Sequence, residues 1–321
     1  MTINPNKTPF AQFDGMNFSN NQCFLCGKPL RENTNSKEHV FPKWLLNRYN
    51  LWDQSIILLN RTSLPYRSLT IPCCSTCNNE HLSRLENDIE RAINNGPNCV
   101  AQVDKIRLYQ WMGKIFLGLF YRELFLSADR SNPELGSITT PAFLQDYRAL
   151  HGFLQSIMKP IEFHDFFPGS LFIFEIETIP EIGAFDYSDN FIGMTLSLRM
   201  GNIGIIACLK DDEQVLETLS ELYQAMKRVK LHPIQFDELC ALIFYKSFSM
   251  VRDGKYVSMT TPENRTTIVK LPGWSLEPIF SKWDNKIYVR FLEEFWAKWG
   301  ITIDEIFVPP NSIRSYLGEY L

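Results

Sequence analysis

The sequence predicts an α+β protein in which a small, cysteine-clamped N-terminal module precedes a larger mixed α+β domain. Two C-x-x-C pairs stand in the N-terminal quarter, an apolar helical pattern runs over residues 104–127, and strand-like and helical patterns share the remainder. A chain of 321 residues is longer than one core usually serves. We therefore expect an N-terminal arm at 1–21, a module at 22–97 and an α+β domain at 98–321.

The elements of the N-terminal part follow from local patterns. Residues 1–21 are polar and rich in Asn, which favours a flexible arm. Apolar runs at 54–60 and 67–71, separated by a turn containing Pro65, predict short strands. A helix is predicted over 78–94, because four apolar residues recur on one face: Leu82, Leu85, Ile89 and Ile93. The sequence Asn95-Gly96-Pro97 ends this helix and sets the domain boundary.

The C-terminal part mixes helices and strands. The 104–127 helix is apolar around most of its circumference, so we expect it to be buried as a hub. Strands are predicted at 170–178, 191–199 and 203–209, the last two joined by a hairpin turn at Met200-Gly201-Asn202. Further helices are predicted at 213–230, 236–252 and 285–299.

Charge and hydropathy limit the setting in which the protein works. The net charge of −4 is not typical of a protein that binds nucleic acid non-specifically, because such proteins are normally basic. Residues 23–91, however, carry nine Lys or Arg against seven Asp or Glu. Any phosphate contact is therefore expected from a local patch. No signal peptide or membrane span is evident, since charges interrupt the apolar stretch at 106–126. We expect a cytoplasmic protein whose cysteines are thiols or metal ligands.

The two cysteine pairs indicate a metal site. Cys23 with Cys26, and Cys74 with Cys77, each present two sulfurs at the spacing that a tetrahedral zinc ion accepts. Four unrelated buried cysteines are the alternative interpretation. Cys73 could also replace Cys74 in the second pair, with the less usual C-x-x-x-C spacing.

The residues around these pairs resemble a known family. Between the pairs lies Glu38-His39-Val40-Phe41-Pro42, and Asn78 directly follows the second pair. The order C-x-x-C, Glu-His-x-x-Pro, C-x-x-C-Asn resembles the zinc-containing branch of the HNH (ββα-metal) endonucleases. The resemblance covers about 70 residues, from 23 to 91, and does not extend to residues 100–321.

The resemblance implies roles for individual residues. It makes His39 the general base that takes a proton from the attacking water, a task suited to imidazole near neutral pH. It makes Glu38 and Asn78 ligands of a catalytic Mg²⁺ or Mn²⁺, and the four cysteines ligands of a structural Zn²⁺. A 5′-phosphate product is also implied. Glu38 stands where the family more often has Asp, and only Asn60 is available to buttress the base.

Several neighbouring residues carry open alternatives. His81, Glu80 and Glu86 could join the metal site, although a solvated helix face explains each equally well. Four cations near the motif are expected to contact phosphate: Lys37, Lys43, Arg48 and Arg84.

The resemblance thus implies a metal-dependent HNH endonuclease that hydrolyses nucleic acid, with DNA as the expected substrate, in a setting of bacterial restriction or phage defence. The alternative is a non-catalytic zinc module that binds nucleic acid or a protein partner. The small basic patch also suggests that a homo-oligomer or a protein partner helps to hold the substrate.

Overall fold

A computed structural model describes residues 20–31, 35–124, 126–138, 144, 147–251, 254–263, 265–271, 278–308 and 312–318. Nearly all of the expected N-terminal arm at 1–21 lies outside these residues. The chain divides into two compact units, each described here by itself. Unit 1 contains the chain up to Arg91 together with Ile106–Asp165 and Tyr256–Lys270; unit 2 contains Ala92–Lys105, Phe166–Lys255 and Leu271–Leu321.

This division differs from the predicted boundary at residue 97. Segments 106–165 and 256–270, expected in the second domain, belong to unit 1. The apolar circumference of the predicted hub helix explains the difference, since a module of about 70 residues has little core of its own and gains one by packing around that helix.

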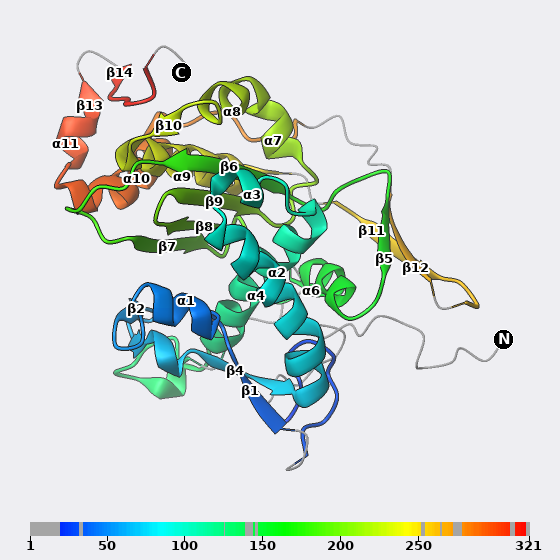
Figure 1. Cartoon of the computed structure of the whole chain (residues 1–321). Coiled ribbons are helices and arrows are strands. Elements are labelled where there is room, and N and C mark those ends of the chain that lie inside the picture. Colours follow the sequence, from blue (N-terminus) through cyan, green and yellow to red (C-terminus); the bar gives the residue numbers. More distant parts are fainter. Residues whose placement is uncertain are drawn as a thin grey trace. The chain divides into compact units, whose positions relative to one another are not determined.

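Unit 1 is built on an antiparallel strand pair followed by a helix (Figure 1). Strand β1 (Asn35–His39) pairs with β4 (Thr70–Cys74), in a register that sets Glu38 opposite Ile71. The chain between them forms α1, the hairpin β2–β3 and a 3₁₀ turn, with bounds Lys43–Arg48, Ser55–Ile57, Ser63–Pro65 and Tyr66–Ser68. After β4 comes a π-helical turn, η2 (Cys77–Leu82), that continues into α2 (Ser83–Asn94).

Helix α4 (Lys105–Glu123) is the hub of unit 1, as its apolar pattern predicts. Its residues from Leu108 to Tyr121 are buried. A Cβ on Gly118 would lie 3.2 Å from Val40 and from Ile71, so this glycine lets the helix approach the β1–β4 pair closely. The ring of Trp111 stacks on that of Trp44, with centroids 6.2 Å apart.

The remainder of unit 1 consists of short helical elements and a small sheet. The helical elements are η3 (Pro133–Leu135), α6 (Arg148–Leu154) and η4 (Gln155–Ile157). A three-stranded sheet of order β11-β12-β5 completes the unit, with bounds Tyr256–Thr260, Thr266–Lys270 and Ile161–His164.

Unit 2 is a five-stranded sheet of order β10-β6-β9-β8-β7, with helices packed on it. The strands are β6 (Ser170–Ile176), β7 (Phe185–Asn190), β8 (Thr195–Met200), β9 (Ile203–Cys208) and β10 (Lys230–Leu231). The helices are α3 (Pro97–Val100), α7 (Gln214–Thr218), α8 (Ser220–Met226), α9 (Pro233–Phe248), α10 (Asn285–Trp296) and α11 (Ile303–Ile306). The turn η5 (Ala297–Trp299) and the pair β13 (Phe307–Val308) with β14 (Ser312–Ile313) follow.

Packing explains why the predicted elements of unit 2 form. The predicted hairpin joins β8 to β9 at Gly201, whose φ of 61° lies in the left-handed region that favours glycine. Gly204 on β9 faces Phe236 of α9 and Ile176 of β6, where no Cβ would fit.

Within the described part of the chain, no helix has the length and hydropathy to cross a membrane.

Candidate metal centre and active site

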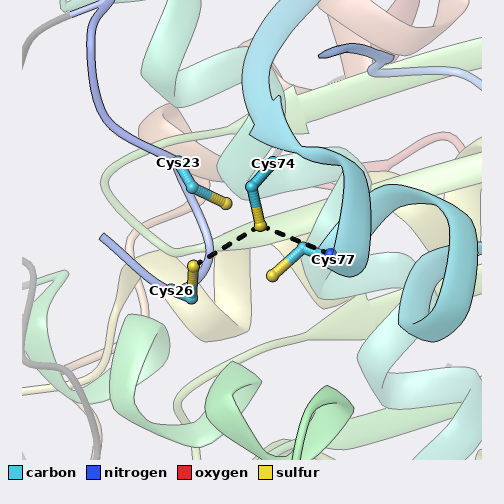
Figure 2. A group of neighbouring side chains, drawn as sticks. All are labelled: Cys23, Cys26, Cys74 and Cys77. Carbon is cyan, nitrogen blue, oxygen red and sulfur yellow. Dashed lines mark hydrogen bonds between the residues drawn. The ribbon is translucent and has the colours of Figure 1, made fainter. Parts of the chain in front are cut away.

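Four sulfurs meet at one point of unit 1 (Figure 2). The ligand atoms of Cys23, Cys26, Cys74 and Cys77 all lie within 4.8 Å of one another, and the Sγ atoms of Cys26 and Cys74 are 3.8 Å apart. A tetrahedron with Zn–S bonds of about 2.3 Å has S–S edges of about 3.8 Å. The group is therefore close enough to hold a metal ion, in the pairing predicted with Cys74.

The crowding of these thiols calls for a positive charge between them. Hydrogen bonds from Cys26, Cys73 and Cys77 hold the pKa of the Cys23 thiol far below its usual range. The interaction with that same sulfur raises the pKa of Cys26 and of Cys77. A thiolate at Cys23 thus disfavours ionisation of Cys26 and Cys77, and a bound cation would favour it.

Cys73 lies beside this group without belonging to it. Its Sγ is 3.9 Å from the Sγ of Cys23, and its side chain is buried. Cys73 precedes Cys74 on β4 and is not one of the four residues whose ligand atoms lie within 4.8 Å of one another. The alternative pair of Cys73 with Cys77 is thus not the one that the structure brings together with Cys23 and Cys26.

Two buried polar residues of unit 1 hold the first cysteine pair in place. His151 Nε2 lies 3.0 Å from the carbonyl oxygen of Phe24, and Gln155 Nε2 donates to that of Leu25 at 2.8 Å. Both carbonyls belong to the turn between Cys23 and Cys26. Such partners orient metal ligands. No local pattern predicted these two residues, because about 130 residues separate them from the turn.

His39 ends β1, far along the strand from the four cysteines. Asn35 pairs with Cys74 and His39 with Thr70, so the two ends of β1 are separated by roughly 14 Å at 3.4 Å per residue. The imidazole stands edge-on to Trp52, with ring centroids 5.7 Å apart. An ion held by the cysteines therefore anchors the strand pair and does not reach His39.

The surroundings of His39 favour the neutral imidazole. Burial lowers its pKa most, and the positive charges of Lys43 and Lys114 lower it further, against an opposite effect of Glu86. Its Nδ1 is buried and has no hydrogen-bond partner among the described residues. A neutral ring is the form that can accept a proton.

Glu38 takes part in a buried ion cluster. Lys114 of α4 is fully buried, and its Nζ lies 2.5 Å from Glu38 Oε1 and 2.8 Å from Glu86 Oε1. The same ammonium donates to the carbonyl oxygens of His39 at 2.6 Å and Val40 at 3.1 Å. One lysine thus ties α2 and α4 to the end of β1, where His39 stands.

This cluster bears on the predicted roles of Glu38 and Glu86. Glu38 is 5% exposed and its Oε1 is paired with Lys114, so this ion pair competes with the predicted role of Glu38 as a ligand of a catalytic ion. Glu86, for which a solvated helix face was one interpretation, instead faces Lys114. Burial raises the pKa of Glu86 to about 7; the nearby ammonium of Lys114 opposes this rise, and the carboxylate of Glu38 adds to it. The sequence could not reveal the cluster, because Lys114 sits 28 and 76 positions from its partners, as the residue numbers show.

Asn78 reaches back to β1. Its Nδ2 donates to Ser36 Oγ at 3.0 Å and to the carbonyl oxygen of Lys37 at 3.4 Å. These contacts place the amide two residues before His39, roughly 7 Å along the strand. Of the two predicted ligands for a catalytic ion, the structure leaves Asn78 Oδ1 open and commits Glu38 to Lys114.

The other predicted residues are distributed around this strand pair. Asn60 does not buttress His39: its Nδ2 donates to the carbonyl oxygen of Ser127 at 3.1 Å, and its Oδ1 accepts from the backbone of Thr62. His81 is half-buried in η2 and is not part of the cysteine group. Glu80 and the four expected phosphate-contacting cations are exposed, namely Lys37, Lys43, Arg48 and Arg84.

Comparisons of the chain with protein-family models, with curated proteins and with solved structures found no match.

Proposed function

We propose that unit 1 is a nuclease module of the HNH type that hydrolyses nucleic-acid phosphodiesters with His39 as general base. The observation that carries the proposal is the position of His39 at the end of β1, in surroundings that favour a neutral ring. Lys114 fixes the backbone at this point through the His39 carbonyl oxygen. A base held in this way can take a proton from water without first losing one itself.

The reaction needs a water, a base and a home for negative charge. His39 accepts one proton from water, the water oxygen bonds to phosphorus, and the P–O3′ bond breaks, with O3′ keeping the bonding electron pair and taking a proton from solvent water. The products are a 3′-hydroxyl and a 5′-phosphate. A Mg²⁺ or Mn²⁺ ion would neutralise charge on the phosphate when bound. Asn78 is the residue placed to hold it, and Glu38 instead acts through Lys114 to position the strand.

A structural Zn²⁺ on the four cysteines completes the proposal. The S–S edge of 3.8 Å suits zinc, and a Cys₄ set leaves no open coordination position for a substrate. Zinc would then hold β4 and the start of α2 against the N-terminal turn, and so hold Asn78 beside β1.

Nicking of supercoiled plasmid in the presence of Mg²⁺ or Mn²⁺ tests the proposal. We expect His39→Ala to slow nicking by about 10²–10⁴-fold, the usual contribution of a general base. His164→Ala is the matched control, because His164 lies in unit 1 with an exposed side chain and should leave the rate unchanged. Equal rates for the wild type and His39→Ala, with zinc content and circular dichroism unchanged, would refute the role of His39.

A second function is favoured by one observation. The engagement of Glu38 with Lys114 removes an acidic ligand from the surface, as expected for a zinc module that binds nucleic acid or a protein partner without cutting. The two functions separate in the same assay. A protein that binds DNA and carries zinc, yet never nicks plasmid or RNA with either ion, would fit the binding module and exclude the nuclease.

A further inference from the structure

A polar groove lies in unit 1 away from His39. It encloses about 680 Å³ between the tip of the β2–β3 hairpin, residues 59–61, and the loop 128–131 that follows α4. One arginine stands on each wall, Arg61 on the hairpin and Arg130 on the loop. Both side chains are exposed, and among the described residues neither has a carboxylate within ion-pair distance.

The groove is held open by hydrogen bonds between its two walls. The carboxylate of Glu123, at the end of α4, accepts from the backbone N–H of Leu59 at 3.1 Å. Asn60 Nδ2 donates to the carbonyl oxygen of Ser127, and Arg130 Nη1 donates to that of Arg61 at 3.2 Å. The groove therefore exists before any ligand arrives, so binding does not have to order the walls.

Its charge suits an anion. Asp129 is the one acidic residue of the lining, and its Oδ1 accepts from the backbone N–H of Ser131 at 2.7 Å. Two guanidinium groups against one carboxylate leave a net positive groove. Arginine presents a planar fork of donors that matches the oxygens of a phosphate.

Apolar side chains beside the arginines point to a nucleotide chain in preference to a free anion. Ile57 and Leu59 are 73% and 53% exposed. Leu59 lies in the turn after β2 and lines the groove, and Ile57 is the last residue of that strand. Sugars and bases of a nucleic acid offer apolar surface next to each phosphate, whereas inorganic phosphate offers none.

The groove also lies at a useful distance from His39. Helix α4 contacts the His39 carbonyl oxygen through Lys114 and the hairpin tip through Glu123. Nine helical residues span about 13.5 Å, or about four nucleotide steps at 3.4 Å per step. A strand bound at His39 could thus continue to the groove.

We propose that the groove between Arg61 and Arg130 binds the phosphodiester backbone of the nucleic-acid substrate about four nucleotides from the bond that is cut. The inference rests on the proposed function and extends it to a second contact on the substrate.

Binding measured without cleavage tests this proposal separately from the nuclease. Fluorescence anisotropy of a labelled 20-mer, duplex and single-stranded, is recorded with EDTA-free, Mg²⁺-free full-length protein over a series of salt concentrations. The slope of the logarithm of the association constant against the logarithm of the salt concentration is negative. In the double variant Arg61→Gln/Arg130→Gln its magnitude should be smaller by about 1.8, at 0.9 per phosphate contact on a duplex. Between 50 and 200 mM salt, the wild type should then lose about tenfold more affinity than the variant.

The control is Arg67→Gln, which removes one positive charge from unit 1 at an arginine already paired with Asp53. It should leave the slope unchanged. An unchanged slope in the double variant, or no binding of either 20-mer by the wild type, would overturn the groove. Competitors test the assignment of the groove to nucleic acid. If inorganic phosphate or polyglutamate displaces the labelled 20-mer as well as unlabelled oligonucleotide does, at equal concentrations of negative charge, that assignment is overturned. If the protein does not nick plasmid but the salt slopes are as expected, the result counts against the proposed nuclease activity and leaves the groove as a binding site.

Discussion

Replacing Lys114 with methionine tests the ion cluster behind His39. Methionine keeps the apolar stem of lysine and removes its charge and its donors. The ammonium contacts two carboxylates and two backbone carbonyls in a fully buried position. The variant therefore leaves Glu38 and Glu86 together without this counter-ion.

The size of the effect follows from these contacts. Removal of one partner from a buried ion pair costs about 3–5 kcal/mol. Each carbonyl left without a donor adds about 1 kcal/mol. We expect the free energy of unfolding of unit 1 to fall by about 5–7 kcal/mol at pH 8, which lies above the pKa of Glu86.

The pH dependence of this loss has a definite sign. The pKa of Glu86 is raised in the folded protein to about 7, above its ordinary value of 4.5, so the folded state holds a proton that the unfolded state releases. Stability therefore falls as pH rises from 4.5 through 7. Lys114 lowers the pKa of Glu86, so without Lys114 this buried carboxyl favours its protonated form still more, and the loss in Lys114→Met should be smaller at pH 5.5 than at pH 8.

Urea unfolding at the two pH values, followed by tryptophan fluorescence, measures this. The triple variant Lys114→Met/Glu38→Gln/Glu86→Gln removes every charge of the cluster and should regain most of the stability. It also keeps the test informative if the single variant does not fold at pH 8. A Lys114→Met protein within 1 kcal/mol of the wild type at pH 8, or a triple variant less stable than the single one, would refute this reasoning.

Further predictions concern metal, pH and packing. Cys74→Ser should abolish the single bound metal ion in elemental analysis, whereas Cys73→Ser should retain it; loss of metal in Cys73→Ser alone would reverse the pairing. Glu86→Gln should flatten the fall in stability between pH 5 and 7.5, and a profile like that of the wild type would assign the titration elsewhere. Gly204→Ala should destabilise unit 2 by about 1–3 kcal/mol through overlap with Phe236, while Gly152→Ala, in open space, should not; equal stabilities would show that the sheet can absorb the added methyl group.

Local pattern was sufficient for much of the fold. The hub helix α4, the hairpin at Gly201 and the stop at Gly96 were predicted from periodicity and turn chemistry, and the structure contains all three. The helix predicted from Asn78 begins as a π-helical turn and becomes α-helical at Ser83, a change that no apolar spacing encodes.

The predicted strand at 67–71 shows where pattern was insufficient. Its first residues form a 3₁₀ turn, and the strand itself, β4, begins at Thr70 and runs into the second cysteine pair. Its partner is β1, about 35 residues earlier, and not the neighbouring hairpin. Pairing over such a distance depends on what the sheet packs against, here α4, and that information is spread over the whole unit.

The candidate site, like the fold, was predictable from the sequence only in part. Spacing alone brought the four cysteines together, because each pair is local and a metal ion supplies the long-range constraint. The role of Glu38 was taken from resemblance, and it depends on Lys114, which periodicity marks only as a charge inside an apolar helix. A lysine that interrupts a fully buried face must find carboxylates in the fold. A buried Lys in a hub helix and a Glu beside a candidate base can therefore be paired in advance, and the pair predicts that this Glu positions the strand of His39 and does not itself bind an ion.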